Sequence, residues 1–128
     1  PLLDRIDMQV EVARLTKSDL MQCKPGEKSE DIRGRVDRAR EIQRQRFSGD
    51  NVLNSQMSAS QVRTCCQISN ESKTWLDRAL DKLLPTARGY DRLLKTSRTI
   101  ADLSGNEKIE LEDLAEAIQY RSAGGEIL

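Results

Sequence analysis

The sequence predicts an all-α domain that is preceded by one short β-strand. Hydrophobic residues make up 37% of the 128 residues and aromatic residues only 3%, which suits thin packing between helices and excludes the core of a large sandwich or barrel. Apolar residues recur at three- and four-residue steps over most of the chain, with capping residues where helices should begin. Only residues 8–12 alternate apolar and polar residues as a strand does.

The expected strand has no second strand in the sequence to pair with. Met8, Val10 and Val12 alternate with polar residues, but a lone strand cannot satisfy its backbone hydrogen bonds. We therefore expect it to pair in an oligomer, or with a sheet in a part of the protein that this chain does not contain. Residues 16–28 lose the pattern and contain a Lys24-Pro25-Gly26 turn, which predicts a polar linker.

Five helices are expected after this linker, at about residues 30–47, 59–67, 71–84, 87–103 and 111–121. Ser29 is the expected N-cap of the first helix. Ser58 and Gln61 have the spacing of a capping box for the second. Thr86 is a suitable cap for the fourth helix, which Ser104-Gly105 should end.

The first of these helices combines a narrow apolar stripe with many arginines. Gly34 within it costs about 1 kcal/mol relative to Ala, so we expect docking against the rest of the domain to hold the helix. The arginines form either a solvated face or a nucleic-acid contact, and the interspersed acids Asp37 and Glu41, with no aromatic residue nearby for base stacking, favour the solvated face. They are Arg33, Arg35, Arg38, Arg40, Arg44 and Arg46.

The composition excludes several classes of function. Lys plus Arg and Asp plus Glu both number 21, which excludes a globally basic nucleic-acid binder. Histidine is absent, so there is no His-based acid–base catalysis or His metal ligation. Cys23, Cys65 and Cys66 lack Cys-x-x-Cys spacing, which predicts reduced thiols in a cytoplasmic protein and no metal site. The sequence contains no membrane-spanning apolar run and no phosphate loop, so the chain should not bind ATP by itself.

Two arginines lie beside helix ends and turns. Arg88 falls in the first turn of the helix expected at 87–103, where the positive end of the helix dipole disfavours a cation. An arginine in that place suggests an anionic partner, because guanidinium binds phosphate oxygens in bidentate fashion. Its position alone nevertheless favours a solvated surface charge. Arg5 lies between Asp4 and Asp7, just ahead of the strand.

Motifs in order along nearly the whole chain resemble one family. Residues 1–7 read Pro-Leu-Leu-Asp-Arg-Ile-Asp, residues 54–57 read Asn-Ser-Gln-Met, and residues 86–103 read Thr-Ala-Arg-Gly-Tyr-Asp-Arg-Leu-Leu-Lys-Thr-Ser-Arg-Thr-Ile-Ala-Asp-Leu. The last is the most specific, because it resembles the Ser-x-Arg-x-Tyr-x-Arg-Ile-Leu-Lys-Val-Ala-Arg-Thr-Ile-Ala-Asp-Leu of magnesium-chelatase-type AAA+ ATPases of the bacterial ComM/YifB group. Thr86 and the Thr96-Ser97 pair are conservative departures, and Gly34 replaces a better helix former.

The resemblance implies a helical lid domain of an AAA+ ATPase, with residues 1–15 as the end of the core, 16–28 as a linker and 29–128 as the C-terminal lid. It implies that Arg5 is an arginine finger that reaches the γ-phosphate of ATP in the adjacent subunit, with Asp4 and Asp7 orienting it. Arg88 would be the sensor arginine that contacts phosphate in its own subunit.

Further cations follow Arg88 on the same helix. Arg92, Lys95 and Arg98 continue at three-residue steps, which indicates either a solvated face or contact with nucleotide or DNA. Trp75, Tyr90 and Tyr120 lie at apolar helical spacing and are expected in the core.

The implied parent protein is a cytoplasmic, ring-forming homo-oligomer that hydrolyses ATP with Mg²⁺, while this chain alone needs no cofactor and is inert. Its expected partners are its own upstream AAA+ core, other copies of itself and DNA, since the group is linked to branch migration of DNA in natural transformation. No membrane partner is expected. Two alternatives stay open: a non-enzymatic helical adaptor that binds DNA or protein, and the lid of a true metal chelatase subunit.

Overall fold

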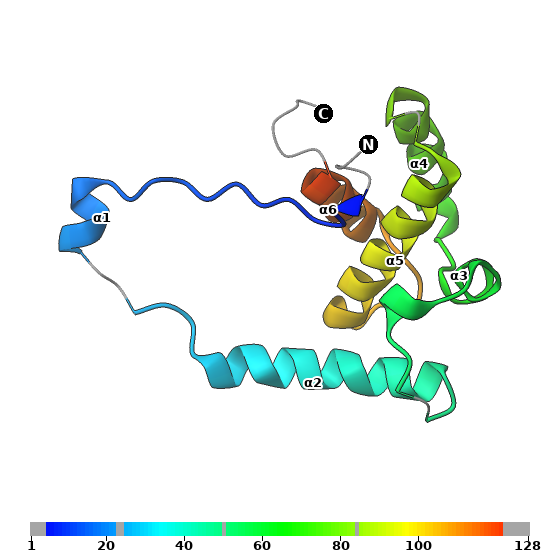
Figure 1. Cartoon of the computed structure of the whole chain (residues 1–128), viewed down its shortest axis with the longest axis horizontal. Helices are drawn as coiled ribbons and strands as arrows, with labels where there is room; N and C mark the ends of the chain where they lie inside the picture. The colour runs from blue at the N-terminus through cyan, green and yellow to red at the C-terminus, as the bar shows by residue number, and fades with distance from the viewer. Residues whose placement is uncertain (1–4, 23–24, 50, 84, 122–128) are drawn as a thin grey trace.

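The computed structural model describes residues 5–22, 25–49, 51–83 and 85–121, and within these ranges the regular elements are helices, with one isolated β-bridge between Ile68 and Ile109 (Figure 1). The elements in order are α1 (Lys17–Met21), α2 (Ser29–Arg46), a 3₁₀ turn η2 (Asn54–Gln56), α3 (Ala59–Cys65), α4 (Asn70–Leu83), α5 (Ala87–Ser104) and α6 (Leu111–Arg121). The all-α prediction is confirmed, and each of the five expected helices forms within two residues of its expected bounds.

The core is centred on α5, which packs against α6, α2, η2 and α3, while α4 packs against α6. Ala101 of α5, Leu114 and Ala117 of α6, and Ile109 between them are completely buried. Trp75, Tyr90 and Tyr120 are partly buried against this core, as the apolar spacing predicted. Backbone hydrogen bonds between the 67–69 segment and Ile109 join the connection before α4 to the connection before α6.

Local signals in the sequence set both ends of α5. The Thr86 side chain accepts a hydrogen bond from the Gly89 N–H at 3.1 Å, which caps the helix start as predicted. At the other end Gly105 takes the left-handed conformation, with φ of 78°. The N–H of Asn106 then bonds to the Ala101 carbonyl at 2.8 Å, which is the pattern of a Schellman motif.

Helix α2 docks on the domain only through its C-terminal half. Ala39 and Gln43 are buried, and Phe47, just past the helix end, joins the core. Ile32 and Val36, on the N-terminal half, are more than 40% exposed, and Figure 1 shows that half projecting beyond the other helices. Because Gly34 weakens the helix, we expect α2 to dock against the rest of the domain. This expectation is confirmed for the C-terminal half of α2. Ser29 is the first helical residue and not the N-cap, which is Lys28 without a side-chain cap.

Residues 5–22 form an arm that runs from α6 out to α1, and residues 25–28 lead back to α2 (Figure 1). The strand predicted at residues 8–12 does not form in the structure. The segment lacks a ladder partner among the described residues, and Val10 and Val12 are exposed by 67% and 85%. A strand needs hydrogen bonds to a neighbouring strand, and alternation of residues cannot supply one.

Helix α1 occupies part of the predicted linker. Its five residues begin at a capping box, in which the Thr16 N–H donates to the Asp19 carboxylate at 2.8 Å and the Asp19 N–H donates to the Thr16 hydroxyl at 3.2 Å. The helix buries no residue. It is therefore set by local hydrogen bonds and not by an apolar stripe, which is why periodicity did not indicate it.

Candidate functional site

A groove of about 550 Å³ lies between the N-terminal segment, α5 and α6. Its cations are Arg88, Arg92 and Lys95, all from α5. Spacings of four and three residues place these three side chains on one face of the helix. The other lining residues are Asp7, Met8, Ser55, Asp91, Thr96, Thr99, Ile100, Leu103, Glu116 and Tyr120.

Arg88 stands in the first turn of α5, and its side chain is exposed. The helix dipole contributes a partial positive charge at the same place, so Arg88 and the helix end together favour an anion. Within the described part of the chain, Arg88 forms no ion pair with a carboxylate. The arrangement has the chemistry of a phosphate contact.

The other two cations of the groove are held by groups of the protein itself. Arg92 pairs through Nε with Asp7 at 3.2 Å, and its side chain is only 21% exposed. Lys95 donates from Nζ to the Ser55 carbonyl at 3.1 Å. Arg88 is therefore the groove cation that is best placed to meet a ligand.

Arg5 does not line the groove, although the segment that carries it does. Arg5 is exposed, and two residues later Asp7 pairs with Arg92 of α5. The structure thus places Arg5 and Arg88 at different positions of the domain and does not bring them together. Asp4, which was expected to orient Arg5, lies outside the described residues.

Arg98 corrects the expectation that Arg92, Lys95 and Arg98 share one face. Six residues along a helix turn a side chain by about 600°, which leaves Arg98 about 120° away from Arg92 and on the core side. Arg98 is 1% exposed, donates to Asp102 at 3.0 Å, and binds the carbonyls of Glu107 and Asn106 at 2.8 and 2.5 Å. It is neither a solvated charge nor available to nucleotide or DNA.

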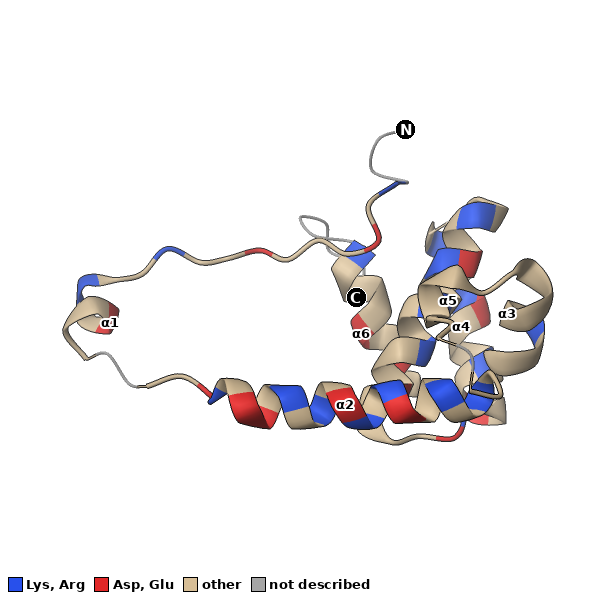
Figure 2. Cartoon of the chain, turned by 60° about the horizontal axis from the view of Figure 1, so that its bottom comes forward, with Lys and Arg blue, Asp and Glu red and all other residues tan. Residues whose placement is uncertain are grey.

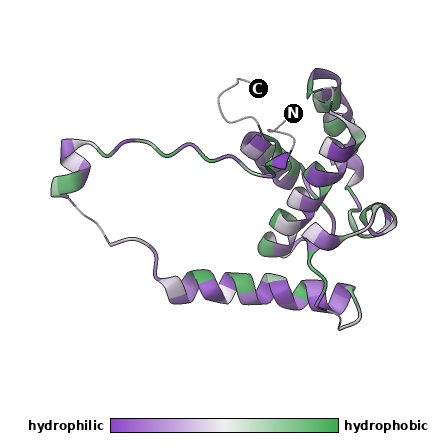
Figure 3. Cartoon of the chain, in the orientation of Figure 1, coloured by the Kyte–Doolittle hydropathy of each residue, from purple (hydrophilic) through white to green (hydrophobic). Residues whose placement is uncertain are grey.

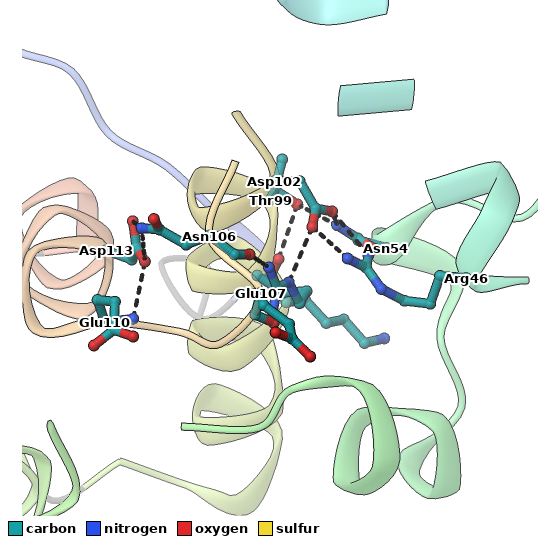
Figure 4. Close-up of polar contacts among 10 residues, drawn as sticks. Arg46, Asn54, Thr99, Asp102, Asn106, Glu107, Glu110 and Asp113 are labelled. Carbon is teal, nitrogen blue, oxygen red and sulfur yellow. Dashed lines mark hydrogen bonds and ion pairs between the residues drawn. The ribbon is translucent and has the colours of Figure 1, made fainter. Parts of the chain in front are cut away.

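Arg98 belongs to a buried network with Asp102, Arg46 and Asn54 (Figure 4). Both oxygens of the Asp102 carboxylate accept from the Arg46 guanidinium, one at 2.8 Å. Asn54 donates to the same carboxylate at 2.8 Å and accepts from Arg46 at 3.0 Å. The hydrogen bonds to Asp102 raise the pKa of Arg46. This network joins α2 and η2 to α5, and it explains why an Arg and an Asp stand four residues apart in the most specific motif.

The remaining arginines of α2 are exposed and mixed with acids. Figure 2 shows basic and acidic residues interspersed along the helix. Arg35 pairs with Glu27, and Arg44 lies 3.2 Å from Glu41. These observations support the solvated face that was favoured for them, with Arg46 as the exception because it is part of the buried network.

The two cysteines that the structure describes, Cys65 and Cys66, do not line the groove. Cys65 is half-buried and Cys66 is buried, and both are free thiols, whereas Cys23 lies outside the described residues. Burial raises the pKa of Cys66 to about 12, so this thiol is uncharged at neutral pH.

Over the described ranges no three His, Cys, Asp or Glu side chains gather where they could hold a metal ion. Within the same ranges, no helix has both the length and the apolar character needed to cross a bilayer.

The chain is similar in sequence to known proteins, and most of it matches one family. Residues 26–121 match the family described as magnesium chelatase, subunit ChlI C-terminal. The chain is 37% identical over 123 residues to the competence protein ComM of Haemophilus influenzae. The aligned region covers 95% of the chain and 24% of that protein. It is 36% identical over 123 residues to the uncharacterized protein YifB of Escherichia coli, with the same two coverages. The chain therefore spans about a quarter of the length of these relatives.

Proposed function

The chain belongs to the ChlI C-terminal family of magnesium-chelatase-like proteins of the ComM/YifB type, and from this premise we propose that it is the lid of an AAA+ ATPase. In this proposal Arg88 contacts the phosphates of ATP bound in the same subunit. The observation that carries it is the exposed guanidinium of Arg88 at the N-terminal turn of α5, on the edge of the groove.

The chemistry of this end of α5 fits a phosphate group. Phosphate oxygens accept hydrogen bonds from guanidinium and from the N–H groups of a helix N-terminus, and both stand in the same turn. The proposal assigns the phosphate contact to Arg88 and not to Arg92, because the Arg92 guanidinium is already paired with Asp7. Mg²⁺ that accompanies ATP would be held by other residues of the full-length protein, since the described residues hold no acidic cluster for it.

We assign Arg5 to the ATP site of an adjacent subunit, as an arginine finger. The exposed Arg5 stands outside the groove of its own chain, which fits action on a neighbour. Its guanidinium would stabilise the negative charge that develops on the transferred phosphoryl oxygens. Such a residue raises the turnover rate about 10³–10⁵-fold, which corresponds to lowering the activation free energy by roughly 4–7 kcal/mol. Asp4 remains the residue proposed to orient it.

The name of one relative supports a proposal for the wider function. That relative is named a competence protein, and for this chain we propose that ATP hydrolysis in a cytoplasmic homo-oligomeric ring drives remodelling of DNA, such as branch migration. Its partners would be its own upstream AAA+ core, further copies of the same protein and DNA.

The two alternatives have less support. A DNA-binding adaptor would need a continuous basic face, whereas the arginines of α2 alternate with acids or are paired. A true chelatase subunit would share the family, but ComM and YifB are relatives that each match 95% of the chain.

The assignment of Arg88 is tested by nucleotide affinity. In the full-length protein, Arg88→Ala should weaken binding of a fluorescent ATP analogue about 10-fold or more, because a charge-assisted hydrogen bond is lost. Arg78→Ala removes an equally exposed arginine from α4, away from the groove, and should leave affinity unchanged. Equal affinities for Arg88→Ala and the wild type would remove the sensor role.

A further inference from the structure

The segment that carries Arg5 is tied to the domain in two places, once at α5, which carries Arg88, and once at α6. The Asp7 carboxylate pairs with Arg92 of α5 at 3.2 Å. The Gln9 N–H donates to the carbonyl of Tyr120 in the last turn of α6 at 2.6 Å. The carbonyls in the last turn of a helix find no N–H donor within their own helix. The hydrogen bond from Gln9 therefore supplies a donor to one of them. Met8, between the two contacts, lines the groove.

These contacts make a short connection between the two arginines. Arg5 is two residues from Asp7, and a two-residue stretch reaches at most about 7 Å. Arg92 is four residues from Arg88 on the same helix face, or about 6 Å along the axis. Arg5 therefore cannot move far relative to α5 while the Asp7–Arg92 pair is intact. The pair is a non-covalent link in this path, and the rest of the path is covalent backbone.

We infer that Asp7 and Arg92 are positioning residues that couple the two ATP sites which one subunit serves. The inference rests on the proposed function. When Arg88 engages phosphate in its own subunit, α5 takes a fixed position, and the Asp7–Arg92 pair carries that position to Arg5 at the neighbouring site. Arg92 then acts through Asp7 and touches no phosphate. Neither the family match nor the names of the relatives assigns this role to either residue.

The test uses the full-length protein with Asp7→Asn, Arg92→Gln and the charge-reversed double variant Asp7→Arg/Arg92→Asp. Each single variant should lower kcat for ATP hydrolysis by between about 10- and 100-fold, because a small misplacement of a catalytic group has that effect. Affinity for the fluorescent ATP analogue should stay within about twofold, because neither residue touches the nucleotide. The double variant should recover kcat, because it rebuilds the pair with reversed charges. A purely structural role would not give this split between kcat and affinity.

Matched controls remove the same charges elsewhere. Asp77→Asn and Arg78→Gln make the same changes at exposed positions of α4 and should leave kcat and affinity unchanged. Circular dichroism verifies that every variant is folded, which is expected because the Asp7 side chain is 56% exposed.

Three results would overturn the inference: unchanged kcat in both single variants, no recovery in the double variant, or a loss of ATP affinity in Arg92→Gln as large as that in Arg88→Ala. The last result would make Arg92 a phosphate ligand. Failure of the proposed function is distinguishable, because then Arg88→Ala itself would leave nucleotide affinity unchanged.

Discussion

At the scale of residues, one buried carboxylate connects three elements of the domain. Asp102 is 2% exposed and faces two guanidinium groups, those of Arg46 and Arg98. Arg98 also binds two carbonyls of the connection between α5 and α6. Each charge of this network is thus both paired and hydrogen-bonded, which is the condition under which burial of charge is tolerated.

Asp102→Asn should destabilise the domain strongly. Asparagine preserves the volume but leaves the charges of Arg46 and Arg98 without a counter-ion, and loss of one partner from a buried pair costs about 3–5 kcal/mol. Urea unfolding of the 128-residue chain measures the effect. Glu41→Gln removes the exposed partner of Arg44 and should cost about 0.5 kcal/mol or less. Equal stabilities of the two variants would show that the network does not hold the fold.

Only part of this network could be predicted from the sequence. Arg98 and Asp102 are four residues apart on a predicted helix, which is a pairing distance. The three-residue steps from Arg92 to Arg98 suggested a shared exposed face instead, and that interpretation was wrong. Arg46 is 56 residues from Asp102, and no local pattern links two residues so far apart. Only the docking of α2 on α5 brings them together.

At the scale of elements, helices with strong local signals formed where they were expected. The capping box of Ser58 and Gln61 is present, as is the cap of Thr86, because both depend on residues within one turn. The predicted strand did not form, because a strand depends on a partner elsewhere. The turn η2 and the helix α1 have few residues and little or no apolar periodicity, and they went unpredicted for that reason.

Substitution of alanine for glycine should change the stability of the fold in opposite directions at two positions of the chain. Gly34 lies in the helical α2 with no atom closer than 3.8 Å to an added Cβ, so Gly34→Ala should stabilise by about 0.5–1 kcal/mol through helix propensity. Gly105 has a φ of 78°, which alanine adopts only with strain, so Gly105→Ala should destabilise by about 1 kcal/mol. Urea unfolding of both variants measures the signs, and equal signs would contradict the conformations described.

At the scale of the whole molecule, the chain has two unlike parts. Helices α3 to α6 enclose a core with the end of α2, while the arm and the first half of α2 leave apolar residues uncovered (Figure 3). The most exposed of these are Val12, Leu15 and Met21. Several large apolar side chains left exposed in one segment are typical of a segment that packs against a partner. This exposure agrees with the proposed lid, which would pack against an AAA+ core.

The candidate site could be predicted only as separate residues. Arg88 was singled out by its place at a helix start, and Arg5 by its resemblance to a motif. The groove depends on α6 and the N-terminal segment coming to the side of α5, which are contacts between distant parts of the chain. The pairing of Asp7 with Arg92 could not be predicted for the same reason.

The most direct test of the central claim is an ATPase assay on mixed oligomers of the full-length protein. One partner carries Arg5→Ala, and the other carries a disabling substitution in the phosphate loop expected upstream of this chain. If Arg5 serves the ATP site of a neighbouring subunit, each variant alone should be inactive although Arg5→Ala still binds nucleotide, and mixing them should restore part of the turnover. Absence of activity at every mixing ratio, with mixed oligomers shown to form, would contradict the account.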